Sequence, residues 1–201
     1  MYWAGFSSYR SAGTSLESLK LDPLTPVLTN GKKGDFDNGG AWLMSIHPKF
    51  DNSDLIGFYH AEDHLFSFEE NPNKIAWKSI AICESIDNGI SWQKAGQILT
   101  SANTKPSVPT WGGNGDHCVV RDKNGRWFCF YSEHNIRMAV SEDPVASPGT
   151  WFKYYEGYFN QPGLGGQGSP IDGLKSSPGG NPSVHYNSYL ETWIMIYHKR
   201  S

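Results

Sequence analysis

The sequence lacks the features that mark nucleic-acid-binding and membrane-spanning proteins. Its 17 lysines and arginines are outnumbered by 20 acidic residues, for a net charge of −3, so it offers no basic surface to a nucleic acid. No apolar run approaches the roughly 20 residues that span a bilayer. The three cysteines, Cys83, Cys118 and Cys129, have no metal-ligand spacing and cannot all pair with one another. We therefore expect no nucleic-acid partner, no membrane association, and thiols that act as small buried hydrophobic side chains.

Targeting and helix signals are also absent. At the N-terminus no basic segment precedes an apolar stretch and a small-residue cleavage site, so no secretory signal is visible. We expect a soluble chain whose location stays open, secreted or periplasmic if a signal peptide precedes it. The chain does contain 22 glycines, 12 prolines, 8 tryptophans, 10 tyrosines and 10 phenylalanines. This composition favours an all-β protein with short strands and many turns.

One stretch, residues 85–92 (Ser-Ile-Asp-Asn-Gly-Ile-Ser-Trp), predicts a hairpin turn between two apolar segments. Asp87 can fold its carboxylate back onto backbone N–H groups, and Asn88 and Gly89 supply the positive φ angles that a tight hairpin needs. Trp92 can pack over the turn from the outgoing strand. We assign this stretch a structural role, not a catalytic one.

The chain also repeats itself. Residues 39–97 align with residues 114–154: in each segment three apolar runs precede a tryptophan, and residues 141–151 form a degenerate copy of the first turn. A third copy begins near residue 180. Self-similarity at a period of about 65 to 75 residues, with four short strand-like runs per unit, indicates β-propeller blades. We expect antiparallel blade-like units at about residues 41–100, 116–158 and 181–201.

Three units, the last one cut short, do not close a ring. Strand edges left open at both ends invite aggregation, because a propeller protects its edges by closure. We therefore expect a single propeller domain that closes by self-association, or a fragment of a five-bladed propeller. The tryptophans that end strand-like runs are expected in the blade cores: Trp92, Trp127, Trp151 and Trp193.

In a propeller, the first strand of each blade starts at the ligand face and the second strand returns to it. Residues at these positions therefore surround one central pocket. In this chain they are rich in acids, histidines and tryptophans, which suits a sugar, because indoles stack on sugar rings and polar side chains bind hydroxyl groups. We expect an oligosaccharide or polysaccharide to contact six of them: Trp42, His60, Trp111, His117, Asn181 and His198.

Four segments carry a resemblance to known enzymes: residues 26–31 (Pro-Val-Leu-Thr-Asn-Gly), 37–41 (Asp-Asn-Gly-Gly-Ala), 58–60 (Phe-Tyr-His) and 80–92. Their order resembles the opening blade of five-bladed glycoside hydrolases of the arabinofuranosidase, xylosidase and invertase type, with the mannoside phosphorylases beside them. Residues 85–92 also resemble the Asp-box of sialidase-type propellers, which lies on the outside of the blades. The resemblance implies a propeller that hydrolyses a glycosidic bond.

The resemblance further implies a site built from acidic residues of different blades. Asp37, or its neighbour Asp35, matches the carboxylate of the first blade, and Asp116 matches that of the second. Glu62 or Glu133 would donate the proton. Glycosidic cleavage requires two carboxylates, a protonated one for the leaving oxygen and an ionised one for water or the anomeric carbon.

Other features leave alternatives open. Asn181 stands where an aspartate is expected, and it can hold a hydroxyl group but cannot act as a base. Few cations are available for the phosphate of a phosphorylase or the carboxylate of a sialidase substrate, and the aspartates of residues 35–40 also suit an ordinary turn. His60, Glu62 and His64 alternate along an extended segment and could hold a divalent metal; otherwise no cofactor is expected. A lectin-like propeller that binds glycan without cleaving it remains the second functional class.

Overall fold

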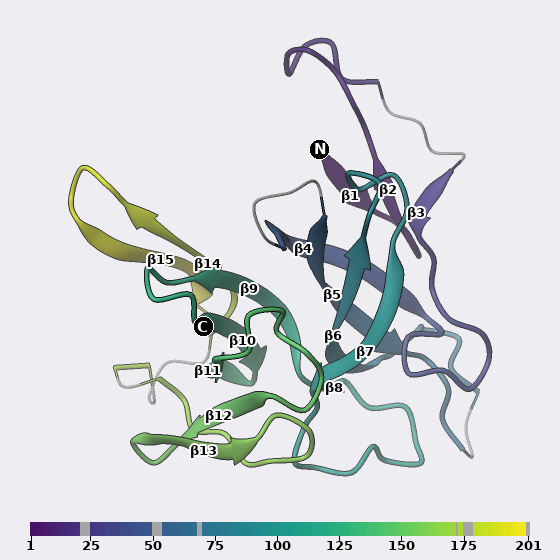
Figure 1. Ribbon diagram of the computed structural model, residues 1–201. Helices are drawn as coiled ribbons and strands as arrows, with labels where there is room; N and C mark the ends of the chain where they lie inside the picture. The colour runs from purple at the N-terminus through teal and green to yellow at the C-terminus, as the bar shows by residue number, and fades with distance from the viewer. Residues whose placement is uncertain (21–24, 50–53, 68–69, 172, 175–178, 200–201) are drawn as a thin grey trace.

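The computed structural model describes residues 1–20, 25–49, 54–67, 70–171, 173–174 and 179–199. In these ranges the chain is all-β, with fifteen strands and no helix (Figure 1). The strands form two large sheets, a three-stranded sheet and a two-stranded hairpin. The expected all-β class with several antiparallel sheets is therefore confirmed.

The first large sheet is an antiparallel meander with one short parallel addition. Its strands are β4 (Gly40–Pro48), β5 (Leu55–Asp63), β6 (Trp77–Ser85) and β7 (Gln93–Leu99), and β8 (Gly112–Gly113) runs parallel to β6. Every residue of β5 from Ile56 to Glu62 is buried. This strand is covered on both faces, which explains why its sequence shows no alternation of apolar and polar residues.

The second large sheet is an antiparallel meander of five strands. They are β9 (Gly115–Arg121), β10 (Trp127–Glu133), β11 (Asn135–Ser141), β12 (Trp151–Tyr155) and β13 (Tyr158–Pro162). His134 alone separates β10 from β11, with a φ angle of 65°. The sheet therefore turns back sharply at this point, and both strand ends lie at one edge.

Two smaller sheets flank the large ones (Figure 1). A three-stranded sheet contains β1 (Tyr2–Ala4), β2 (Ser8–Arg10) and β3 (Pro26–Leu28). A hairpin contains β14 (Gly179–Asn187) and β15 (Thr192–Lys199). The first of these sheets packs on the first large sheet, because Leu28 of β3 shares a buried cluster with Tyr59 of β5.

Aromatic side chains fill the space between the two large sheets. Phe58 of β5 is fully buried, and its ring centroid lies 5.6 Å from that of Trp127 and 6.0 Å from that of Trp151. Tyr59, the next residue, belongs to the core on the opposite face of the first sheet. Successive residues of β5 thus serve two cores, because alternate side chains of a strand point to opposite faces.

β9, the first strand of the second large sheet, lies between β4 and β14. The backbone N–H of Val119 in β9 donates to Oγ of Ser45 in β4 at 2.9 Å, and the N–H of Val184 in β14 donates to Sγ of Cys118 in β9 at 3.3 Å. The first strands of the three repeats therefore lie in chain order. The described strands form an open series of sheets, and no closed ring is present among them (Figure 1).

The turn at residues 85–92 has the predicted geometry. Oδ1 of Asp87 accepts the backbone N–H groups of Ile90 at 3.0 Å and Ser91 at 2.9 Å. Asn88 and Gly89 have φ angles of 58° and 77°. The hydroxyl and the backbone N–H of Ser91 contribute most to lowering the pKa of Asp87, to about 2.

The predicted degenerate copy is also a turn closed by an aspartate. Oδ1 of Asp143 accepts the backbone N–H of Val145 at 3.0 Å, and the N–H of Asp143 donates to Oγ of Ser141 at 3.3 Å. The N–H of Asp87 makes the same bond to Ser85 at 3.4 Å in the first turn. The second turn therefore keeps the bond to the serine, and its aspartate still accepts backbone N–H groups, even though its loop is longer.

Three of the four tryptophans predicted in blade cores are buried. Trp92, Trp127 and Trp151 expose 9%, 0% and 1% of their surface. The prediction for Trp193 is wrong, because 46% of this residue is exposed. It lies on β15, and in the described part of the chain no third strand joins the β14–β15 hairpin.

The thiols are largely where the sequence places them. Cys83 and Cys129 are free and buried, and burial raises the pKa of both. Cys118 is only half-buried, and it lies at the contact between β9 and β14. Over the described residues, the chain has no helix with the length and apolar character needed to cross a membrane.

Candidate functional site

The strand ends that the repeat assigns to a ligand face gather at one edge of the two large sheets. β5 ends there with Asp63 and β10 ends there with Glu133, while β6 begins there with Trp77 and β9 with Gly115. An antiparallel meander returns every second strand end to the same edge. Residues far apart in the sequence therefore meet at this edge.

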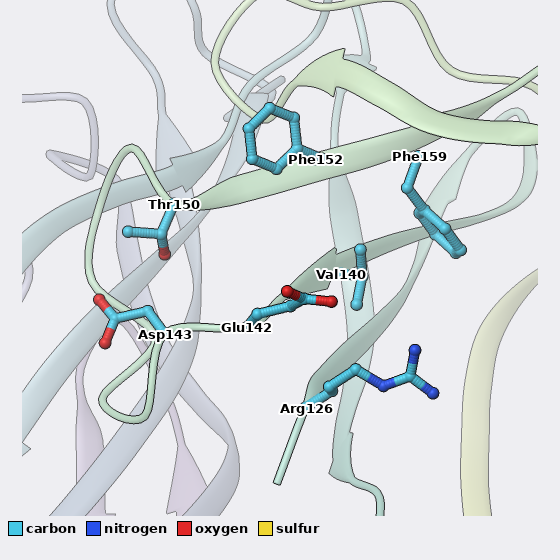
Figure 2. A pocket seen from close by; sticks show the side chains of 7 residues that line it. All are labelled: Arg126, Val140, Glu142, Asp143, Thr150, Phe152 and Phe159. Carbon is cyan, nitrogen blue, oxygen red and sulfur yellow. The ribbon is translucent and has the colours of Figure 1, made fainter. Parts of the chain in front are cut away.

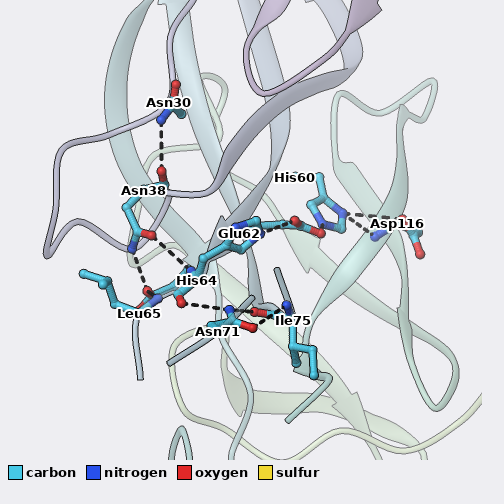
Figure 3. Close-up of polar contacts among 10 residues, drawn as sticks. Asn30, Asn38, His60, Glu62, His64, Leu65, Asn71, Ile75 and Asp116 are labelled. Carbon is cyan, nitrogen blue, oxygen red and sulfur yellow. Dashed lines mark hydrogen bonds and ion pairs between the residues drawn. The ribbon is translucent and has the colours of Figure 1, made fainter. Parts of the chain in front are cut away.

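His60 joins the two large sheets there. Its ring stacks on the indole of Trp42, with centroids 5.0 Å apart and planes 20° apart. Nδ1 of His60 accepts the backbone N–H of Asp116 at 3.0 Å, and Nε2 lies 3.2 Å from Oε1 of Glu62 (Figure 3). Because a backbone N–H can only donate, Nδ1 carries no proton, and Nε2 donates to Glu62.

Glu62 accepts hydrogen bonds from two imidazole rings. It is 6% exposed, and its second oxygen lies 2.8 Å from Nε2 of His64. Burial raises the pKa of Glu62, but the hydrogen bonds from His60 and His64 outweigh burial and lower the pKa. Glu62 is therefore ionised at neutral pH, which does not suit a proton donor.

The metal alternative for this cluster finds no support. The polar atoms of His60, Glu62 and His64 face one another as hydrogen-bond donors and acceptors. Among the residues that the structure describes, no group of three or more His, Cys, Asp or Glu side chains is arranged to hold a metal ion. The cluster is a hydrogen-bonded array.

Asn38 holds the end of β5 in place. Its Oδ1 accepts the backbone N–H of His64 at 3.1 Å, and its Nδ2 donates to Oδ1 of Asp63 at 2.6 Å (Figure 3). The other oxygen of Asp63 pairs with Nζ of Lys105 at 2.6 Å. These bonds limit the movement of the strand end that carries Glu62.

Asp116, the second residue of β9, has a strained backbone conformation. Its φ angle of 27° lies in the region that favours glycine, and such strain persists only where the surroundings hold it, often at functional sites. Its side chain is 32% exposed, compared with 2% for Asp37, 8% for Glu62 and 14% for Glu133. Among the four predicted carboxylates, Asp116 is the most open to a ligand.

The junction between the second large sheet and β14 repeats this arrangement. Asn181 has a φ angle of 52°, and its backbone N–H donates to Oγ of Ser132 at 3.0 Å. In the sequence repeat, Ser132 corresponds to His60 and Asn181 corresponds to Asp116. Ser132 also donates to the carbonyl oxygen of Asp116 at 3.2 Å. Equivalent positions thus join consecutive sheets.

A groove of about 630 Å³ adjoins these junctions, and Ser132 is part of its wall. The wall also includes Lys78 of β6, the 59% exposed Trp111, and Glu133. One oxygen of Glu133 accepts the Ser101 hydroxyl at 2.6 Å, and the other pairs with Arg137 at 3.1 Å. The groove therefore offers an indole surface, a carboxylate and a lysine to one ligand.

Two predicted acids lie elsewhere. Asp37 is 1% exposed; it accepts the Tyr59 hydroxyl at 3.2 Å and pairs with Lys94. Because Tyr59 and His60 are neighbours on β5, Asp37 lies on the opposite face of the sheet from His60. Asp35 accepts the backbone N–H of residue 32 at 2.8 Å in an exposed turn. We therefore assign both aspartates structural roles.

The predicted sugar-binding residues divide in the same way. His117 is 2% exposed, and burial lowers its pKa to about 3. It is thus a neutral core residue with no exposure to a ligand. Trp42 is half-buried with its ring on His60. His198 pairs across the hairpin with Gly180, beside Asn181, at the ligand-face edge.

The sequence did not single out Lys78, Ser101, Lys105 or Arg137 as parts of the site. Three of these lie in or beside the groove through contacts with segments distant in sequence, such as the 32 residues that separate Ser101 from Glu133. The pairing of β5 with β6 is the one signal that could have pointed to Lys78, because this pairing places Lys78 directly opposite Glu62.

A second groove, of about 590 Å³, lies at the far end of β11. Figure 2 shows the side chains of Glu142 and Arg126 beside it, and its full lining is Arg126, Val140, Glu142, Asp143, Thr150, Phe152 and Phe159. β11 begins at the ligand-face edge with Asn135 and ends here with Ser141. This groove is therefore separate from Asp116 and provides control positions.

Comparison with known proteins adds no further constraint. No protein-family model matches the chain, and no curated protein matches it. The functional argument consequently depends on the geometry of the site.

Proposed function

We propose that this chain forms all or part of a β-propeller that hydrolyses glycosidic bonds in an oligosaccharide or polysaccharide. Two antiparallel meanders whose first strands lie in series, with strand ends gathered at one edge, support the propeller. Its remaining edges would be covered by self-association or by further blades. The observation that carries the function is Asp116, a partly exposed carboxylate in a strained conformation where consecutive sheets meet.

In this proposal Asp116 is the ionised carboxylate that activates water or attacks the anomeric carbon. Glu133, which lines the groove, protonates the leaving oxygen after it has exchanged its ion pair with Arg137 for a proton. His60 is a positioning residue. Its bond to the backbone N–H of Asp116, at 3.0 Å, fixes the start of β9, and Glu62 and Trp42 hold the imidazole from two other sides.

A glycan-binding module without catalysis is the second candidate. The observation in its favour is that both oxygens of Glu133 already have partners, Ser101 and Arg137. A carboxylate held in this way maintains the shape of the groove, and the exposed indole of Trp111 would then bind sugar rings by stacking.

The test replaces Asp116 and Glu133 singly by their amides. Turnover of aryl glycosides and polysaccharides is expected to fall by about 10²- to 10⁴-fold in each variant, with a much smaller change in glycan affinity measured by calorimetry. Asparagine tolerates a positive φ angle, so Asp116→Asn is expected to fold normally. Glu142→Gln, in the second groove, is the matched control and is expected to retain full turnover.

The outcomes separate the two candidates. Unchanged turnover in Asp116→Asn would remove this residue from the mechanism. A wild-type protein that binds glycans tightly but releases no sugar would support the binding module, and Asp116→Asn would then lower affinity alone.

A further inference from the structure

Lys78 is a cation in the groove wall without an acidic partner among the described residues. Among the described residues, the lysines and arginines that form ion pairs with acidic side chains are Lys49, Lys94, Lys105, Arg126 and Arg137. Glu62 lies directly opposite Lys78 on β5, but its oxygens accept bonds from His60 and His64. Lys78 therefore forms no ion pair with the described side chains around it.

Backbone packing holds Lys78 in this position. A Cβ atom on Gly113 would lie 2.1 Å from the carbonyl oxygen of Lys78, and one on Gly115 would lie 2.9 Å from its Cδ. The N–H of Asn114 donates to the same carbonyl at 3.0 Å. Glycines thus let β8 and the start of β9 press against the backbone and stem of Lys78, which restricts where its ammonium group can go.

The ammonium group of Lys78 lies near an exposed indole that lines the same groove. Its Nζ lies 6.0 Å from the ring centroid of Trp111. The acid of the groove, Glu133, is already paired with Arg137, so it does not neutralise Lys78. A neutral sugar that covered this site would remove water from an unpaired cation, which is unfavourable. A sugar that carries a carboxylate would pair with it.

We propose that the groove is a subsite for a uronic acid residue, so that the substrate class is an acidic polysaccharide. The sugar ring stacks on Trp111, and the carboxylate at its C6 position pairs with Lys78. This inference rests on the proposed function, because it assumes that the groove binds glycan.

The experiment compares two tetrasaccharides by calorimetry in the Asp116→Asn background, which prevents their hydrolysis. One is a uronate tetramer, and the other is the same tetramer with its carboxylates reduced to hydroxymethyl groups. The acidic tetramer is expected to bind about tenfold more tightly, the gain of one charge-assisted hydrogen bond. Added salt is expected to reduce this preference.

Lys78→Met keeps the stem of the side chain and removes its charge. It is expected to abolish the preference for the acidic tetramer, because the acidic tetramer loses its partner and the neutral tetramer no longer removes water from an unpaired cation. Lys123→Met, at the exposed turn between β9 and β10, is the matched control and is expected to keep the preference.

Each outcome decides a different question. Equal affinity for both tetramers, or a preference that survives Lys78→Met, would overturn the acidic subsite and leave the proposed function standing. Binding of neither tetramer, together with no hydrolysis of any glycan by the wild-type chain, would overturn both. If Lys78→Met fails to fold, the preference for the acidic tetramer and its salt dependence can still be measured in the Asp116→Asn protein. These two measurements then decide whether the groove is an acidic subsite.

Discussion

The two junctions between consecutive sheets share a backbone geometry and differ in their chemistry. At the first junction, His60 accepts the N–H of Asp116, and at the second, Ser132 accepts the N–H of Asn181. In both, the donor has a positive φ angle and the acceptor is buried. Only the first junction adds an ionised carboxylate, Glu62, behind the acceptor.

This difference separates what supports the fold from what can perform chemistry. The shared hydrogen bond joins the end of a second strand to the start of the next sheet, which is a requirement of the architecture. The imidazole and carboxylates are additions to one copy of that scaffold, as expected where function resides in sites placed on a common fold. Equivalent substitutions at the two junctions therefore test directly whether the first junction differs from the second.

The largest expected difference is in stability. His60→Ala removes one of the two donors to buried Glu62 and the acceptor for Asp116, so we expect the free energy of unfolding to fall by about 3 to 5 kcal/mol. Ser132→Ala removes neutral hydrogen bonds only and is expected to cost about 1 to 2 kcal/mol. Urea unfolding followed by tryptophan fluorescence measures both.

His60→Gln is the control for this pair, because its amide can still donate to Glu62. It is expected to recover part of the stability that His60→Ala loses. Equal losses in His60→Ala and Ser132→Ala would show that the charged groups at the first junction add nothing to its strength.

The next effect is a pH dependence that belongs to the first junction. His117 has a pKa of about 3 in the folded chain, caused first by burial, against about 6.5 when unfolded. Below pH 6.5 the unfolded state binds the proton and the folded state does not, so stability falls as pH decreases from about 6.5 to 3.

The contribution of His117 to this slope is up to about 1.4 kcal/mol per pH unit. His117→Phe removes the titrating group, so its free energy of unfolding is expected to vary less between pH 7 and 5 than that of the wild type. Urea titrations at each pH give the comparison. Parallel pH profiles for the two proteins would show that His117 is already protonated in the folded state or is exposed.

The smallest effect is expected at the second junction. Asn181→Asp adds a carboxylate there without an imidazole behind it, so turnover is expected to stay within about twofold of the wild type. The double variant Asp116→Asn, Asn181→Asp is expected to remain as inactive as Asp116→Asn alone. Recovery of turnover in the double variant would mean that the two junctions are interchangeable.

Local features of this fold could be predicted from the sequence. The turn at residues 85–92 depends on Asp87, Asn88 and Gly89, which contact only their near neighbours. The all-β class follows from composition and from short apolar runs. The positions of Asp116 and Asn181 at equivalent strand starts follow from the repeat.

The site could be predicted only in part. Asp37 and Asp116 both lie among glycines and asparagines in the sequence, yet one is buried against Tyr59 and the other is partly exposed. Whether each aspartate is buried or exposed depends on which face of β5 its loop reaches, and no local sequence pattern encodes that face. The exposure of Trp193 likewise depends on whether another strand covers its hairpin.

The sequence by itself determined the all-β class, the turn at residues 85–92 and the spacing of the repeat, because these depend on composition and on short local patterns. The fifth strand of the second large sheet and the parallel addition of β8 to the first were not among its predictions. Tertiary structure alone decided which carboxylate meets solvent, that His60 meets Asp116 across 56 residues, and that Lys78 lies without an acidic partner among the described residues. Burial and ion pairing depend on how distant segments approach one another, and that approach is set by the packing of whole sheets.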